Sequence, residues 1–237
     1  MDFTYDGYLG LINLLKNKNY NFCSYLNYSD YDKAVIFRHD IDNSLNKALE
    51  IARLEFENNI TSTFFVLLST DFYNIFSKQS NEILKEIMSL GHQIELHFDE
   101  KRYEIANYKE LEYWVARESV ILGNALEKEI KVVSMHRPSR WILENDIQFP
   151  GIINSYSKKF LSDFKYLSDS RMHWREDVLG IIESQDYDRL HILTHPFWYA
   201  DKNDKINNKL MDFIENAKSE RYNHLKDNIR DLNEIIN

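Results

Sequence analysis

AVIFRHDID, residues 34–42, is the central segment of this chain, where four apolar residues lead into four ionisable ones. Its first four residues are apolar, and because β-branched and aromatic side chains suit a covered, pleated surface, we predict a buried strand over residues 34–38. Side chains on a strand alternate, so Arg38, Asp40 and Asp42 share one face for as long as the chain stays extended. The two carboxylates then lie about 6–7 Å apart. Such a pair calls for a divalent cation or an arginine beside it, although an Asp-rich turn before a capped helix explains the same residues equally well.

Strand and helix patterns alternate outward from this stretch. After the first strand, buried strands are predicted at 61–68, 93–97, 130–135, 164–167 and 190–193, and amphipathic helices at 7–16, 44–57, 81–90, 108–128, 178–184 and 204–236. Ser44 and Ser80 are the predicted helix N-caps, and Gly91 is predicted to end its helix in the left-handed conformation. The alternation predicts an α/β fold with parallel strands and crossover helices.

Ionisable side chains follow successive predicted strands, at the point where each strand ends. Taken singly, each has an ordinary explanation: a histidine after an apolar run is commonly a core residue, and an aspartate between serines is commonly a turn residue. A structural role does not explain why so many polar groups gather at one end of the strands, since buried charges are costly unless they are paired or metal-bound. In a barrel, these ends converge on the face that carries active sites. The residues are Asp40, Asp42, His97, Asp99, His136, Arg137, Asp169 and His195.

Composition narrows the class of protein. The chain has 237 residues and 43% hydrophobic residues, enough for a sizeable core. Its net charge of −9 argues against a nucleic-acid partner. The single cysteine, Cys23, excludes an internal disulfide and a cysteine-based zinc site. The first residues lack a signal-peptide pattern and no apolar run is long enough for a membrane span, so a cytoplasmic location is expected; the oligomeric state is left open.

Five short motifs, in order, resemble those of the polysaccharide deacetylases of the NodB-homology type, carbohydrate esterase family 4. They are RHDID at 38–42, GHQIELH at 91–97, HRPS at 136–139, Ser168-Asp169 with Trp174, and LTHP at 193–196. The resemblance covers about residues 34–199 and is strongest to a branch of the superfamily met among surface-polysaccharide genes. The five motifs are specific to the family when they occur together, whereas no single motif is. It implies a single-domain distorted (β/α) barrel of about seven parallel strands over residues 1–237, with a covering segment at 1–33 and a C-terminal helix at 204–236.

The resemblance also implies a reaction, metal-assisted removal of an acyl group from an amino sugar. Asp42 and His97 are implied metal ligands, Asp40 the base that takes a proton from water, and His195 the acid that protonates the leaving amine. Arg137 is implied to orient Asp40, and Asp169 to hold His195 or Arg137. Aromatic residues near the motifs suit stacking on a sugar ring, or ordinary packing; they are Trp141, Trp174, Phe197, Trp198 and Tyr199.

One position departs from the family pattern. The second metal-binding histidine is expected four residues after His97, where this chain has Lys101. A third ligand is needed for a catalytic zinc site, and Asp99 and His136 are the candidates, with His92 ranked last because it points to the opposite strand face. A His/Asp set without thiolates suits Zn, with Co, Mn or Ni as alternatives.

Three hypotheses about function follow. The first is a metal-dependent N-deacetylase acting on an acylated amino sugar, and, given the expected location, on a nucleotide-linked or lipid-linked precursor rather than finished wall polymer. The second is a hydrolase or deformylase of a non-sugar amide. The third is a non-catalytic saccharide-binding relative that has lost its metal, as Lys101 suggests. The retained acid and base favour the enzyme hypotheses.

Overall fold

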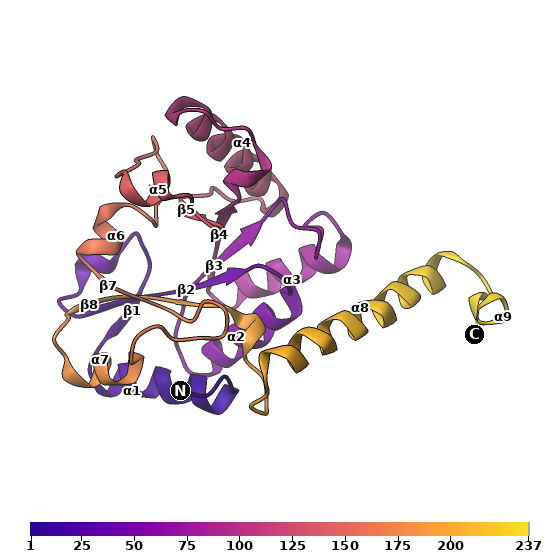
Figure 1. The fold of residues 1–237 in the computed structure, drawn as a ribbon, viewed down its shortest axis with the longest axis horizontal. Coiled ribbons are helices and arrows are strands. Elements are labelled where there is room, and N and C mark those ends of the chain that lie inside the picture. Colours follow the sequence, from indigo (N-terminus) through magenta and orange to yellow (C-terminus); the bar gives the residue numbers. More distant parts are fainter. Residues whose placement is uncertain (237) are drawn as a thin grey trace.

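The computed structural model describes residues 1–236 as one curled, parallel sheet surrounded by helices (Figure 1). The strands are β1 Asn21–Cys23, β2 Ala34–Ile41, β3 Thr63–Leu67, β4 Gln93–Phe98, β5 Val132–Met135, β6 Ile153–Asn154, β7 Lys165–Ser168 and β8 Arg189–Thr194. The helices are α1 Tyr5–Asn17, α2 Leu45–Glu57, α3 Lys78–Ser89, α4 Tyr108–Leu126, α5 Arg140–Glu144, α6 Lys158–Ser162, α7 Val178–Ser184, α8 Ile206–Asn228 and α9 Leu232–Ile235.

Seven strands form a continuous parallel path in the order β6-β5-β4-β3-β2-β8-β7, and β1 pairs with the first half of β2. This confirms the predicted α/β barrel-like fold with about seven parallel strands. β2 lies in the middle and all eight of its residues are buried, which agrees with its apolar start. The carboxyl ends of the strands therefore meet on one side of the molecule, around the end of β2.

Strand alternation separates two cores on the two sides of β2. Val35 and Phe37 face outward and pack in the large cluster that includes Leu11 of α1. Ala34 and Ile36 face inward and pack in a smaller cluster within the curl of the sheet. The same alternation turns the next inward positions, Arg38 and Asp40, toward the interior.

Local signals place most elements correctly, with corrections at their ends. Ser44 caps α2 as predicted, and Gly91 follows α3 with a φ of 92°. The cap of α3 is Ser77 rather than Ser80, because the Ser77 hydroxyl accepts from the amide of Ser80. Between residues 145 and 163, where the sequence pattern predicts neither strand nor helix, the structure contains β6 and α6.

The C-terminal segment leaves the body of the molecule. Figure 1 shows α8 extending away from the sheet, with the short α9 at its far end, so the single helix predicted over 204–236 is divided in two. α8 has no buried residue among those described. No helix within residues 1–236 combines the length and apolar character that crossing a membrane requires.

Candidate metal and catalytic site

Three predicted ligands meet where β2, β4 and β5 end. The Oδ1 atom of Asp42 lies 3.3 Å from Nε2 of His97 and 3.3 Å from Nδ1 of His136. The two histidine nitrogens are 3.2 Å apart. These three residues are the group that meets the geometric requirement for a shared metal ion among the described residues.

The spacing of these three atoms fits a divalent cation. Ligand atoms bound tetrahedrally at about 2.0–2.1 Å lie about 3.3–3.4 Å from one another. The Oδ1 atom of Asp42 is buried and receives no hydrogen bond within residues 1–236, which is unfavourable for a carboxylate oxygen unless a cation compensates. Burial by itself would raise the pKa of Asp42, but His136 and His97 hold it well below its usual range, so the carboxylate is ionised. The residues present therefore fit the implied metal.

Asp99, the other candidate ligand, lies outside this group. The chain turns directly after β4 into a short 3-10 helix, Glu100–Arg102, and Asp99 is its N-cap. One oxygen of Asp99 accepts from the amide of Lys101 at 3.1 Å, and the other pairs with Arg137 at 2.6 Å. Asp99 is a candidate from the sequence because a continued strand would place it on the same face as His97, but the turn ends the extended geometry before Asp99 can share that face.

Asp40 has a different arginine partner from the one expected. Arg38, fully buried, donates from Nη2 to Oδ2 of Asp40 at 2.8 Å, and also donates to Ser134 and Ser155 at 2.7 and 3.0 Å. Burial by itself would raise the pKa of Asp40, but Arg38, with the histidines nearby, lowers it below its ordinary value. Arg137 pairs with Asp99 instead, with a side chain 58% exposed. The orienting contact that the resemblance assigned to Arg137 is thus made by Arg38.

His195 and Asp169 form the other side of the site. Nδ1 of His195 lies 2.6 Å from Oδ1 of Asp169, and the backbone amide of His195 donates to the same carboxylate. The hydroxyl of Tyr199 donates to Oδ2 of Asp169 at 2.9 Å. Burial by itself would lower the pKa of His195, but Asp169, together with Asp42 and Asp40, raises it to about 9. His195 therefore carries a proton at neutral pH, with its Nε2 3.8 Å from Asp42.

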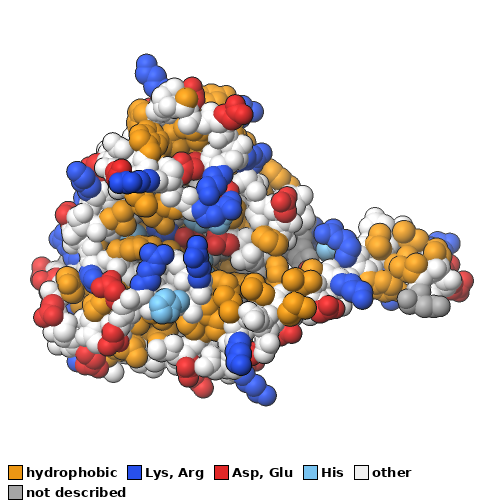
Figure 2. Space-filling view, in the orientation of Figure 1, with side chains coloured by type: hydrophobic (Ala, Val, Ile, Leu, Met, Phe, Trp, Pro, Cys, Tyr) orange, Lys and Arg blue, Asp and Glu red, His pale blue; other side chains and the backbone are white. Residues whose placement is uncertain are grey.

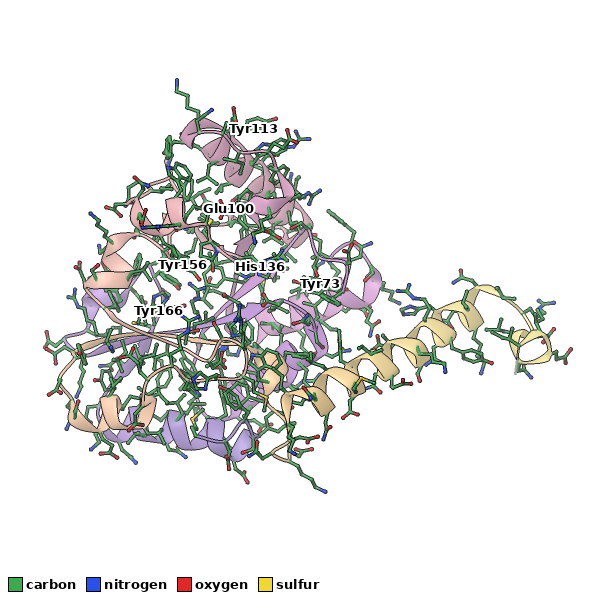
Figure 3. All side chains as sticks on the ribbon, viewed as in Figure 1. Tyr73, Glu100, Tyr113, His136, Tyr156 and Tyr166 are labelled. Carbon is green, nitrogen blue, oxygen red and sulfur yellow. The ribbon has the colours of Figure 1, made fainter. Side chains whose placement is uncertain are left out.

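A cavity of about 780 Å³ opens above these residues. Four aromatic side chains line it: Tyr156, Tyr166, Trp174 and Trp198. Figure 3 shows Tyr156, Tyr166 and His136 grouped in the middle of the molecule, whereas Tyr113 of α4 lies at its edge. The indole nitrogens of Trp174 and Trp198 are buried and have no acceptor within the described residues.

The remaining predicted aromatics lie elsewhere. Tyr199 is fully buried beneath the site. Phe197 packs against Phe213 of α8, at a ring distance of 5.1 Å. Trp141 is 39% exposed and is absent from the cavity lining.

A second polar network lies on the outward face of β2, behind the site. Glu55 of α2 accepts from Tyr8 at 2.6 Å and lies 2.9 Å from Nε2 of His39, whose Nδ1 is 2.6 Å from the hydroxyl of Thr194. His92 contacts the same carboxylate at 3.5 Å, so it points away from the metal ligands, as predicted. Glu55 gave no functional signal in the sequence, because it lies within an ordinary amphipathic helix pattern. A buried acid there is recognisable only from its three-dimensional partners.

Comparisons with known proteins give structural matches alone. No family model and no curated protein sequence matches the chain. Among solved structures, peptidoglycan deacetylase PdaC from Bacillus subtilis is 16% identical, with a TM-score of 0.46, over 83% of this chain and 97% of that one. IcaB from Ammonifex degensii is 16% identical, with a TM-score of 0.42, over 55% of this chain and 65% of that one.

A third similar structure is described as a CE4 family pseudoenzyme. It is BA3943 from Bacillus anthracis, 14% identical, with a TM-score of 0.42, over 80% of this chain and 62% of that one. The chain thus spans less than two thirds of the length of IcaB and of BA3943. In the order of its motifs the chain is similar to the polysaccharide deacetylases of carbohydrate esterase family 4, and solved structures described as deacetylases and as a pseudoenzyme of that family are among those that resemble it.

Proposed function

We propose that this protein is a metal-dependent deacetylase that removes an acyl group, typically N-acetyl, from an amino sugar or a sugar precursor. The observation that supports it most directly is the triangle of Asp42 Oδ1, His97 Nε2 and His136 Nδ1, with sides of 3.2–3.3 Å, placed between the buried Asp40 carboxylate and His195, which pairs with Asp169. His136 takes the position in the ligand set that Lys101 leaves vacant. Zn is the metal that this donor set suits, with Co, Mn or Ni as alternatives.

The side chains around the triangle divide the work of amide hydrolysis. A bound divalent ion would supply Lewis-acid activation of water and of the acyl carbonyl. Asp40, kept ionised by Arg38, accepts the proton of the attacking water. His195, kept protonated by Asp169, donates a proton to the departing amine nitrogen. The hydrogen bonds from Arg38 to Ser134 and Ser155 hold its guanidinium, and through it Asp40, in one position.

The cavity supports a sugar as the part of the substrate that is recognised. Trp174 and Trp198 offer flat apolar ring surface, and Tyr156 and Tyr166 offer rings and hydroxyls. Such groups suit a sugar ring, whose faces are apolar and whose edge carries hydroxyls.

Metal content tests the proposal most directly. Protein purified without chelator and measured by elemental analysis is expected to hold about one equivalent of a divalent metal. Asp42→Ala and His136→Ala should lose it, and Asp99→Ala, the matched control beside the site, should retain it. An unchanged metal content in His136→Ala would exclude His136 as the third ligand, and no metal in the wild type after reloading would favour a saccharide-binding protein without catalysis.

Activity then separates the substrate classes. Release of acetate from N-acetylated sugars by the wild type, and none from Asp40→Asn, is the expected result. Turnover of simple non-sugar amides or formamides in preference to sugars would assign the enzyme to the alternative class of amide hydrolases.

A further inference from the structure

Four basic side chains surround the mouth of the cavity. Lys101 follows β4, Arg137 follows β5, and Arg171 and Arg175 follow β7; all four are exposed and line the cavity. We call them the basic rim. Figure 2 shows lysine and arginine side chains gathered around a hollow in which acidic and histidine side chains are visible. This concentration is unexpected in a chain whose net charge is −9.

Three members of the basic rim have no internal partner. Within residues 1–236, the side chains of Lys101, Arg171 and Arg175 form no ion pair and no hydrogen bond, whereas Arg137 pairs with Asp99. A structural role would require contacts with protein groups, and these three cations make none of that kind. Their charge is therefore directed to solvent or to a ligand at the cavity mouth.

The acids in the cavity leave the rim charge unneutralised. Asp40 is paired with Arg38, which lies beneath it, and Glu176 is paired with Lys165 at 2.5 Å. Asp42 is one of the three proposed metal ligands. A bound divalent ion would add further positive charge. The acids on the cavity floor therefore already have cationic partners, and the positive charge of the basic rim is not neutralised by them.

The backbone of the basic rim is also unusual. Arg137 and Arg171 have φ values of 50° and 59°, and Met172, next to Arg171, has 56°. Residues with a β-carbon adopt this left-handed conformation at an energetic cost, and such positions cluster at ligand-binding sites. Two of the four rim cations thus occupy conformations that neither a helix nor a strand explains.

We propose, building on the deacetylase function, that the substrate is an anionic acylated amino sugar, with its negative group bound by the basic rim while the acyl group lies over Asp42, His97 and His136. Anionic oxygens are the shared chemistry, and two sources supply them: a phosphate ester, as in a sugar linked to a nucleotide or lipid diphosphate, or the carboxylate of a uronic acid. Guanidinium groups bind both kinds of oxygen with two parallel hydrogen bonds.

Calorimetric binding to the metal-loaded protein tests this proposal independently of turnover. The ligands are N-acetylglucosamine, its 1-phosphate, UDP-N-acetylglucosamine and N-acetylglucosaminuronic acid. At least one charged ligand should bind tenfold or more tightly than the neutral sugar, and its affinity should fall as NaCl is raised from 50 to 300 mM. The phosphate ligands and the uronic acid distinguish the two sources. Equal affinity for neutral and charged sugars would overturn the proposal.

The double variant Arg171→Gln/Arg175→Gln tests whether these two arginines of the basic rim bind the negative group of the ligand. Its affinity for the preferred charged ligand should fall by about tenfold for each guanidinium removed, with its affinity for the neutral sugar unchanged. Lys218→Gln/Arg221→Gln, on the exposed α8, removes the same charge and should change neither. If the two double variants lost equal affinity for the charged ligand, net charge alone would explain the effect, and this would contradict a specific site. Charge-dependent binding without acetate release would support the basic rim as an anion site and refute the deacetylase assignment. Acetate release without a preference for charged ligands would support the deacetylase assignment and refute the anion site.

Discussion

Replacing Arg38 by methionine should destabilise the protein more than any comparable change of a surface arginine. The Arg38 guanidinium is fully buried, donates to Asp40, Ser134 and Ser155, and lies 5.1 Å from the ring centroids of Phe65 and Tyr156. Methionine fills much of the same volume but leaves the Asp40 carboxylate, 4% exposed, without its cation. Breaking a buried pair in this way costs about 3–5 kcal/mol.

The coupling free energy between Arg38 and Asp40 is measured by a double-mutant cycle of Arg38→Met, Asp40→Asn and both together. The free energy of unfolding is determined with urea, on chelator-treated protein at pH 7. The two single losses should sum to about 2–3 kcal/mol more than the double loss, because each single variant leaves one polar group unpaired. The pKa of Asp40 is lower in the folded protein than its ordinary value of 3.8. The ionised carboxylate therefore contributes fully to the free energy of unfolding at pH 7, and this contribution is lost as the pH falls below 3.8.

Arg137→Met is the matched control for this cycle. It also removes an arginine paired with an aspartate, but the Arg137 side chain is 58% exposed, so we expect a loss of about 1 kcal/mol or less. The reasoning is refuted if Arg38→Met costs no more than Arg137→Met, or if the two changes in the cycle are additive.

Three further predictions concern other buried groups. Burial, together with the Arg38 charge, lowers the pKa of His191 to about 3, so the unfolded chain binds a proton there that the folded protein does not, and stability should fall as the pH drops from 6.5 towards 3. His191→Gln should reduce the slope of unfolding free energy against pH in that window by up to about 1.4 kcal/mol per pH unit, and an unchanged slope contradicts the assignment. Glu55→Ala should cost about 3–5 kcal/mol in urea unfolding, because it leaves His39, Tyr8 and Ser62 without their shared acceptor, whereas Tyr8→Phe should cost about 1 kcal/mol; equal losses would argue against a network centred on the carboxylate. Asp169→Asn should lower kcat about 100-fold or more with little change in KM, since it disturbs the proton donor His195 and leaves the cavity lining intact; a change confined to KM would assign Asp169 to substrate binding.

The framework of the fold, and most of the residues that meet at the proposed site, could be predicted from sequence patterns alone. Apolar runs of strand length alternating with capped amphipathic stretches require parallel strands with crossover helices, and parallel strands bring their carboxyl ends together. This is why Asp40, Asp42, His97, His136, Asp169 and His195 could be assigned to one site from their positions after predicted strands. Helix caps such as Ser44 and Gly91 were equally readable, because capping depends on residues close in sequence.

Contacts between these side chains could not be predicted, because they depend on packing between segments that are distant in sequence. Arg38 meets Ser134 and Ser155, 96 and 117 residues further along the chain, because the curled sheet brings β2, β5 and β6 around one interior. Asp99 and Arg137 turn toward each other because one caps a 3-10 turn and the other has a left-handed backbone, and neither local conformation follows from strand periodicity. Side-chain direction beyond the last strand residue depends on the path of the following loop, and that path is set by packing between segments that are distant in sequence.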